Sequence, residues 1–158
     1  MLTEDGCLVV ARGAGLEVRG ASNAPTLLKA GGDQTYDIAA VFEQSTPPQS
    51  GPPLHVHHES AEMFYVLEGT FIFRAGNRDV EAPAGTFIFV PKGVQHTYFN
   101  IGSAPARILY WFSPAAGMTS YFKELSELPP GPVDRSLLDT IARRHGVEIV
   151  GGPLKPSE

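Results

Sequence analysis

The sequence predicts an all-β fold, an antiparallel barrel or sandwich, with a helical segment at its C-terminal end. Gly (17) and Pro (14) are scattered along the chain, as expected for turns between many short strands. Between these turns apolar and polar residues alternate with the period of strands, and after residue 113 the spacing becomes helical. The length of 158 residues argues for one domain over residues 1–158. We divide it into N-terminal strands at 1–50, a core barrel at 51–113, and C-terminal helices with a tail at 114–158.

The N-terminal fifty residues are expected to supply the first strands. Residues 7–20 predict two short strands around a glycine turn, with Cys7 as a small apolar residue in the first of them. Residues 35–43 alternate cleanly, which predicts a strand with Tyr36, Ile38, Ala40 and Phe42 on one face. The run QSTPPQSGPP at 44–53 then predicts an extended loop, because proline cannot continue the pattern.

From residue 54 onward strands are expected in rapid succession. Gly76-Asn77 is a favourable pair for a two-residue hairpin, and Pro91-Lys92-Gly93 fits a type I turn. The expected strands are LHVHH (54–58), AEMFYVLE (61–68), TFIFRA (70–75), RDVEA (78–82), TFIFV (86–90), VQHTYF (94–99) and PARILYWF (105–112).

Two helices are expected after the barrel, separated by the Pro-Pro-Gly-Pro run at 129–132. Ser136 and Asp139 form an N-terminal capping pattern for the second helix, and Gly146 is a suitable residue to end it. The apolar residues at helical spacing are Met118, Tyr121, Phe122, Leu125 and Leu128 in the first helix, and Leu137, Leu138, Ile141 and Ala142 in the second. These helices are expected to cover the outside of the barrel.

The composition excludes several classes of function. The net charge is −5, and no basic run occurs, which argues against nucleic acid and anionic membranes as partners because both are polyanions. A single cysteine excludes an intramolecular disulfide bond. No apolar stretch reaches the ~18 residues of a membrane helix. The opening MLTEDG lacks the pattern of a signal peptide, so we expect a cytoplasmic protein.

The stretch HVHHESAE, residues 55–62, concentrates potential metal ligands. On a strand, His55 and His57 point to the same side and His58 to the other. Glu62 follows after a bend and can return to the same side from the next strand. Imidazole nitrogen and carboxylate oxygen together suit first-row divalent ions, and Fe, Ni, Co, Mn and Zn remain equally open. We interpret His58 and Glu59 as bystanders.

A fourth ligand must come from the two remaining histidines. His145 is expected near the C-terminal end of a helix, where histidine commonly interacts with free carbonyl groups. His96 lies in a predicted strand, with Val94 and Tyr98 on its face, and is the better choice. The predicted metal ligands are therefore His55, His57, Glu62 and His96.

These residues fall within two longer motifs. Residues 55–69 read H-x-H-x4-E-x6-G, and residues 85–100 read G-x5-P-x-G-x2-H-x3-N. They resemble the two motifs of the cupin superfamily, except that the glycine expected six residues before the first histidine is Gly51, four residues before it. The resemblance implies a jelly-roll barrel with a three-His, one-Glu metal site in its mouth. The layout, the aromatic-rich strands and the helical C-terminus look most like the quercetin-dioxygenase-like branch.

Aromatic residues on the inward face are expected to fill the barrel, and those near the metal to line an apolar pocket. Asn100 is interpreted as a loop residue. Leu109 and Trp111 face the other way and are expected to pack against the helices or against a second subunit of a homodimer. The candidates for the substrate pocket are Tyr98, Phe64, Phe73, Tyr110 and Phe112.

Three functions fit these residues. The first is a metal-dependent dioxygenase acting on an aromatic or enol-containing small molecule, with Glu62 as its general base. The second is a metal-containing protein that binds a small molecule without turnover. The third is a metal-assisted isomerase or cyclase, which would use the same residues without O2.

Overall fold

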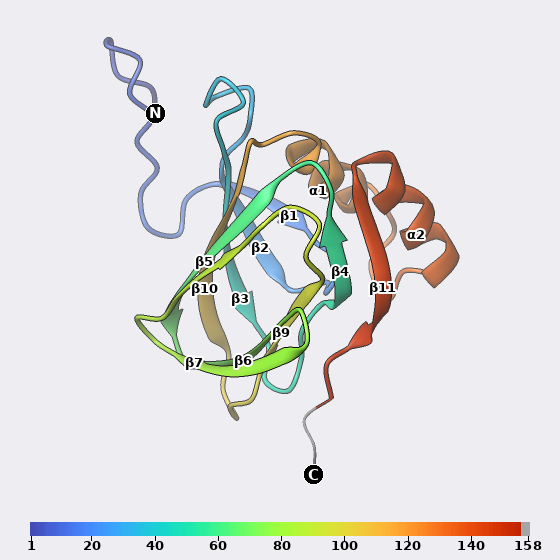
Figure 1. Cartoon of the computed structure of the whole chain (residues 1–158). Helices are drawn as coiled ribbons and strands as arrows, with labels where there is room; N and C mark the ends of the chain where they lie inside the picture. The colour runs from blue at the N-terminus through green and yellow to red at the C-terminus, as the bar shows by residue number, and fades with distance from the viewer. Residues whose placement is uncertain (156–158) are drawn as a thin grey trace.

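The computed structural model describes residues 1–155 and consists of two antiparallel β-sheets that close into a barrel, with two helices beside it (Figure 1). The predicted all-β jelly-roll fold with C-terminal helices is confirmed. The six-stranded sheet has the order β1 (Leu16–Arg19), β2 (Pro25–Ala30), β3 (Ala40–Thr46), β10 (Ala106–Ser113), β5 (Ala61–Glu68), β8 (Phe87–Val90). The five-stranded sheet has the order β11 (Val147–Pro153), β4 (Pro53–His57), β9 (His96–Asn100), β6 (Thr70–Ala75), β7 (Arg78–Pro83).

The barrel interior is filled by the alternate side chains of its strands. Along β3 and β10 every second residue is buried, as the period of two requires. Phe42 of β3 stacks on Tyr110 of β10 with ring centroids 5.4 Å apart, and it lies 4.2 Å from Phe122. Because Phe122 belongs to the first helix, that helix completes the core rather than only covering it.

The predicted strand at 35–43 is wrong in its first half. Residues 32–37 form turns, in which the backbone N–H groups of Gln34 and Asp37 donate to the carbonyl groups of Gly31 and Gly32. Tyr36 and Ile38 are 91% and 68% exposed, so they do not share the buried face of Phe42. The turn hydrogen bonds and the positive φ angles of Tyr36 and Asp37 override the alternating pattern.

The first fifteen residues also differ from the prediction. Only Leu16–Arg19 form a strand, and the preceding segment extends away from the barrel (Figure 1). Its order comes from one bridge between Leu2 and Leu8 and from local turn hydrogen bonds. Cys7 is exposed and lies outside any strand, because no neighbouring strand pairs with this segment.

Several residues predicted to lie in loops belong to strands instead: Gln44 to Thr46, Pro53 and Asn100. β3 continues through Gln44 to Thr46, which leaves only residues 47–52 as the proline-rich connection. Asn100 ends β9 and is fully buried. Its amide nitrogen donates to the carbonyl groups of Thr46 and Ala104, at 3.0 and 2.9 Å. Asn100 therefore ties β9 to the end of β3, and the interpretation of it as a simple loop residue is wrong.

The helices α1 (Met118–Ser126) and α2 (Arg135–Arg144) confirm the predicted pair, and neither is long and apolar enough to cross a membrane. The cap of α2 is Asp134, whose carboxylate accepts from the backbone N–H of Leu137, and not the predicted pattern at Ser136 and Asp139. Gly146, with φ of 74°, follows the helix as expected.

The segment after Gly146 is a strand and not a tail. β11 pairs antiparallel with β4, and the register places Val147 opposite His57 and Ile149 opposite His55. α2 packs against β11 beside the barrel (Figure 1). The alternating segment VEIV, residues 147–150, is compatible with a strand, but it is too short to predict one from the sequence alone.

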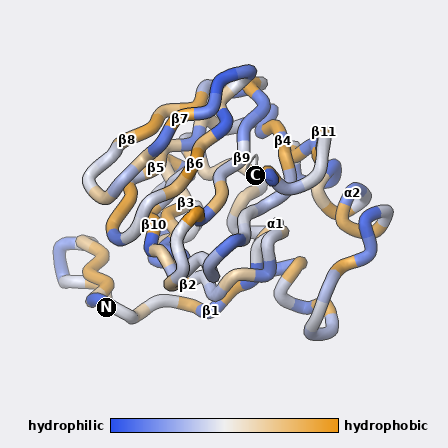
Figure 2. Tube along the Cα trace, turned by 90° about the horizontal axis from the view of Figure 1, so that it is seen from below, coloured by the Kyte–Doolittle hydropathy of each residue, from blue (hydrophilic) through white to orange (hydrophobic). Residues whose placement is uncertain are grey.

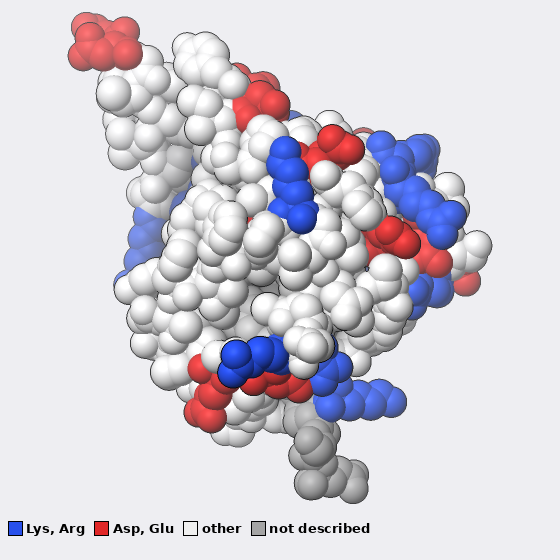
Figure 3. Space-filling model, viewed as in Figure 1, with Lys and Arg blue, Asp and Glu red and all other residues white. Residues whose placement is uncertain are grey.

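The outer face of the six-stranded sheet carries an uncovered apolar surface. Trp111 of β10 lies 6.2 Å from Phe87 of β8, measured between ring centroids. Phe87 and Phe89 are each more than half exposed, and β8 is hydrophobic along its length (Figure 2). A broad part of the molecular surface seen in Figure 3 lacks charged side chains. Packing of this face against a second subunit stays a prediction.

Candidate metal centre

Four side chains from three strands converge inside the barrel mouth. His55 and His57 lie on β4, His96 begins β9, and the register pairs His55 directly with His96. Glu62 comes from β5, in the opposite sheet. The bend at residues 58–60 lets the chain pass from one sheet to the other between His57 and Glu62. All four residues predicted as metal ligands are therefore brought together.

The spacing of the potential ligand atoms suits one ion. One nitrogen or oxygen from each of the four residues lies within 4.8 Å of all the others. The Oε2 atom of Glu62 is 2.7 Å from Nε2 of His96 and 3.1 Å from Nε2 of His57. With bonds of about 2.0–2.2 Å to a central ion, ligand atoms necessarily lie within about 4.4 Å of each other, so only small adjustments are needed.

Two histidines are oriented by backbone carbonyl groups. Nδ1 of His55 lies 2.7 Å from the Pro53 carbonyl oxygen, and Nδ1 of His96 lies 3.0 Å from that of Val94. A proton on each Nδ1 satisfies these carbonyl groups and directs Nε2 toward the site. Metal-binding histidines are commonly held in this way, because the outer hydrogen bond fixes both the tautomer and the ring orientation.

His57 supplies the observation that tests the fit to a metal. Its side chain is buried, and within residues 1–155 neither ring nitrogen makes a hydrogen bond of acceptable geometry. A buried polar atom without a partner costs about 1–3 kcal/mol. A cation within reach of Nε2 would remove this cost at that atom. The residues therefore fit a divalent metal ion, held by His55, His57, Glu62 and His96.

The electrostatics of the site favour an ionised carboxylate beside neutral His55 and His57 and a protonated His96. Burial raises the pKa of Glu62, but the neighbouring imidazoles of His57 and His96 outweigh it and lower the pKa to about 2. Burial lowers the pKa of His96, yet its hydrogen bond to Glu62 reverses the effect and leaves the pKa raised. With both of its nitrogens facing acceptors, His96 holds a proton that a metal ion would displace.

His55 makes the stability of the metal-free protein depend on pH. Burial, followed by the charges of His96 and His57, lowers the pKa of His55 from 6.5 to about 3. As the pH decreases, His55 therefore becomes protonated near pH 6.5 in the unfolded chain but only near pH 3 in the folded protein. The free energy of unfolding falls as the pH drops between these values. Burial also lowers the pKa of His57, which adds to this slope. The two histidines together outweigh His96, whose raised pKa opposes the slope near pH 6.5.

We expect the urea midpoint of metal-free protein to decrease between about pH 7 and about pH 5. The variant His55→Asn should show a flatter dependence, since it lacks this titration. His58→Asn is the matched control, because His58 is exposed and paired with Glu148. An equal slope in His55→Asn and in the parent protein would contradict the assignment.

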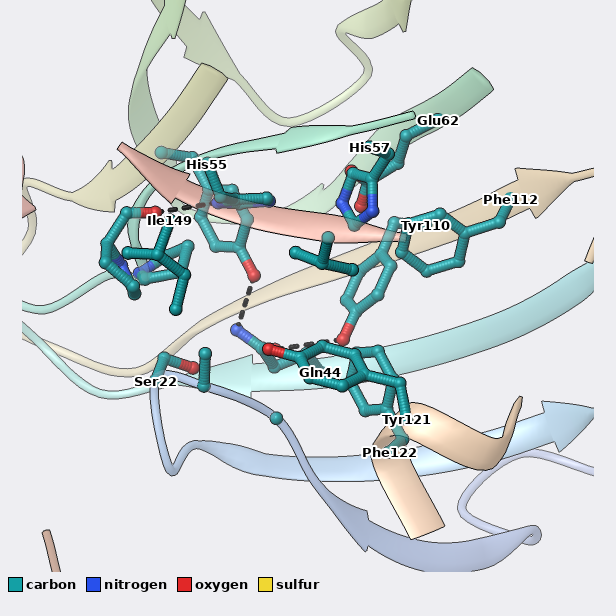
Figure 4. A pocket seen from close by; sticks show the side chains of 16 residues that line it. Ser22, Gln44, His55, His57, Glu62, Tyr110, Phe112, Tyr121, Phe122 and Ile149 are labelled. Atoms are coloured by element: carbon teal, nitrogen blue, oxygen red, sulfur yellow. Dashed lines mark hydrogen bonds and ion pairs between the residues drawn. The ribbon is translucent and has the colours of Figure 1, made fainter. Parts of the chain in front are cut away.

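A small cavity of about 40 Å³ is lined by three of the four ligands, His55, His57 and Glu62 (Figure 4). Its far side is formed by Gln44 and by the segment Gly20–Ser22, and its rim by β11 and α1. Among the described residues, no Lys or Arg lines it. Its wall is mostly apolar: the lining residues besides the metal ligands are Gly20, Ala21, Ser22, Gln44, Pro52, Pro53, Tyr98, Tyr110, Phe112, Tyr121, Phe122, Val147 and Ile149.

Of the five aromatic residues predicted for the substrate pocket, three line the cavity and two do not. Tyr98, Tyr110 and Phe112 line the cavity. Phe64 and Phe73 are buried and contact each other with ring centroids 4.9 Å apart, and they belong to the core rather than to the cavity wall. Their inward direction was predictable from strand parity, whereas their depth in the barrel was not.

The remaining histidines lie outside the centre. His58 is exposed and pairs with Glu148 at 2.8 Å, and Glu59 is exposed beside it, as expected for bystanders. The side chain of His145 contacts Glu124 at 2.5 Å and not the free carbonyl groups of its helix. The ion pair joins α1 to the end of α2.

Sequence reasoning missed the lining residues that come from outside the central strands. The sequence pattern predicts a loop at Gln44 and a tail at Val147 and Ile149, and it predicts that Tyr121 and Phe122 cover the outside of the barrel. The signal available was the parity of Gln44 with Phe42 on a continued strand, and the alternation of the VEIV segment.

Comparison with known proteins identifies the central part of this fold. Residues 42–112 match the family model described as a cupin domain. The match covers 71 of the 158 residues. It contains the four ligands, whereas the segments that complete the mouth of the barrel, Gly20–Ser22, α1 and β11, lie outside it.

The curated proteins to which this chain is similar are diverse. The tetracenomycin polyketide synthase protein TcmJ of Streptomyces glaucescens is 32% identical over 62 residues, which is 39% of this chain and 42% of that protein. An oxalate-binding protein of Thermotoga maritima is 33% identical over 63 residues, 40% of this chain and 52% of that protein. The match thus spans about half the length of these curated relatives.

A solved structure extends the likeness in fold. The crystal structure of a predicted oxalate decarboxylase from Thermotoga maritima superimposes with a TM-score of 0.61 at 23% identity, over 67% of this chain and 99% of that chain. At this level of identity the likeness concerns the fold alone, and activity must be argued from the site.

Proposed function

We propose that this protein is a metal-dependent dioxygenase of the cupin type, acting on a small molecule that carries an enol or an acidic hydroxyl group. The observation that carries the proposal is a largely buried three-His, one-Glu cluster beside a cavity with aromatic walls, whose described lining holds no charged side chain other than Glu62. A divalent metal ion bound there supplies Lewis-acid chemistry, which lowers the pKa of a coordinated hydroxyl group and orients the substrate.

The cavity favours a small and weakly charged substrate. A volume of about 40 Å³ accommodates roughly three water-sized centres, because one water needs about 10–15 Å³ on this measure. A flavonol, as in a quercetinase, would have to extend through the mouth between β11 and the Gly20–Ser22 segment. A dianion such as oxalate would find no Lys or Arg among the described lining residues to balance its second charge.

The acid and base groups of the cavity favour oxygenation over isomerisation. Apart from the metal ligands, the described lining offers only hydroxyl and amide groups, of Ser22, Gln44 and three tyrosines. Burial raises the pKa of Tyr98 and Tyr110 above the ordinary value of 10.0, so both stay protonated. An isomerase or cyclase must both remove a proton and return one to carbon, whereas ionisation of an enol needs a single proton transfer to one acceptor.

Glu62 is the group placed to accept that proton. With a pKa of about 2 it is a weak base, so it accepts a proton only from a hydroxyl group that has been acidified, and only after giving up the hydrogen bond to His96. The carboxylate of Glu62 therefore has two roles, binding the metal ion and accepting a proton. Replacement by an amide distinguishes them, because an amide oxygen can still bind a metal ion but is not a base.

The direct test is O2 consumption by protein loaded in turn with Fe, Ni, Co, Mn and Zn, in the presence of small enols and hydroxylated aromatic compounds. We expect uptake of O2 with product formation for at least one pair of metal and substrate. Binding without product would favour the small-molecule-binding alternative, and equal turnover without O2 would favour an isomerase or cyclase.

The variant Glu62→Gln is expected to retain part of the metal and to lose at least about a hundredfold in kcat, since general-base catalysis contributes about 10²–10⁴-fold. Metal content and kcat are measured on the same preparation, so that loss of the ion is separated from loss of the base. His58→Gln serves as the control and should keep both. Undiminished kcat in Glu62→Gln would remove the proton-accepting role.

A further inference from the structure

Gln44 is a buried amide that connects two tyrosines across the floor of the cavity. It lies on β3, on the side of the cavity opposite His57 and Glu62 (Figure 4). Its side chain is 2% exposed, and every polar atom on it has a partner. Nε2 donates to the hydroxyl oxygens of Thr46 and Tyr98, both at 2.9 Å, and Oε1 accepts from the hydroxyl group of Tyr110 at 3.2 Å.

The amide gives the two tyrosines opposite roles. Tyr110 uses its proton as a donor to Gln44. Tyr98 instead accepts from Gln44, so its own proton must point elsewhere. In the described part of the chain, no acceptor lies within hydrogen-bonding reach of that proton, and the Tyr98 side chain lines the cavity. A buried donor without a partner is costly, and a ligand oxygen in the cavity would satisfy it.

We propose that Tyr98, oriented by Gln44, donates a hydrogen bond to an acceptor oxygen of the substrate, and that this pair selects small ligands carrying a carbonyl oxygen in addition to the oxygen that faces the metal ligands. The inference rests on the proposed function for the presence of a substrate in this cavity. It adds a residue that distinguishes among ligands of similar size, since the rest of the wall is largely apolar.

The arrangement requires the amide of Gln44 specifically. A carboxylate at this position has only acceptors, so both tyrosines would turn their protons toward it. The ligand would then lose its donor although the Tyr98 hydroxyl group is still present. Gln44→Glu should therefore resemble Tyr98→Phe in ligand binding.

The test measures binding of pyruvate and propionate to cobalt-loaded protein by the visible spectrum, without O2 and without turnover. The two probes differ in the keto oxygen. Tyr98→Phe is expected to weaken pyruvate binding about five- to tenfold, the effect of one hydrogen bond, and to leave propionate binding within about twofold. The infrared keto band of bound 2-¹³C-pyruvate should move to higher frequency, which a purely structural defect would not produce.

Tyr65→Phe is the control, because Tyr65 lies on β5 outside the cavity lining and is 41% exposed. It should leave pyruvate binding within about twofold. A loss in Tyr65→Phe as large as in Tyr98→Phe, or equal weakening of both probes, would overturn the proposal. If Tyr98→Phe selectively weakens pyruvate binding while the parent protein consumes no O2 with any substrate, the proposed dioxygenase function is wrong and the proposed role of Tyr98 holds.

Discussion

Protein in which His96 is replaced by Gln is expected to lose its metal on dialysis. His96 contributes Nε2 to the cluster and is 1% exposed, so no other side chain or solvent can readily take its place. Changes in groups that only support a metal ligand cost about 10–100-fold in affinity, and removal of a ligand should cost at least about a hundredfold. Elemental analysis of dialysed protein measures this directly.

The same variant should also lose the stabilisation that metal provides. A ligand that binds only the folded protein raises its stability in proportion to the logarithm of concentration over Kd. Added metal should therefore raise the Tm of the parent protein and not that of His96→Gln. His58→Gln is the control from the same histidine cluster, since His58 is exposed and its partner is Glu148. Equal metal content in His96→Gln and the parent would contradict the assigned ligand set.

The substitution Gly51→Ala is expected to destabilise the protein by about 3 kcal/mol, at the upper end of the usual cost of overpacking. A Cβ atom on Gly51 would lie 1.9 Å from the carbonyl oxygen of Tyr98 and 3.1 Å from Cα of Phe99. Both contacts are with the backbone of β9, which cannot yield as a side chain can. Because β9 also carries His96, metal affinity should fall together with stability.

Urea denaturation of the metal-free protein checks this effect, and metal binding follows in the same variant. Gly152→Ala is the control, since a Cβ atom there meets no atom within 4 Å and the change should stay within about 0.5 kcal/mol. A similar small effect for Gly51→Ala would show that β9 can move away from this loop. In that case close contact with β9 would not explain why a glycine is found at position 51, four residues before His55.

Most of the central strands were predictable from the sequence, because the residues next to each boundary specify where the strand begins and ends. β5 and β6 begin and end where the pattern indicates, since Gly69 and the Gly76-Asn77 pair separate strands of clear alternation. The same periodicity failed at 35–39, where turn hydrogen bonds outweigh it, and at 44–46, where the strand continues through polar residues that are buried. Short segments such as β11 become strands only through pairing with a distant partner.

The metal ligands were predictable because their types and spacing are local properties of two short motifs. Strand parity alone put His55 and His57 on one side and His58 on the other. The cavity was not predictable, because its wall is assembled from β3, β11 and α1, which are far apart in the chain. The sequence by itself determined which atoms can hold an ion. Only the tertiary structure decided what faces that ion, since the direction of the Tyr98 hydroxyl group depends on Gln44, 54 residues earlier in the chain.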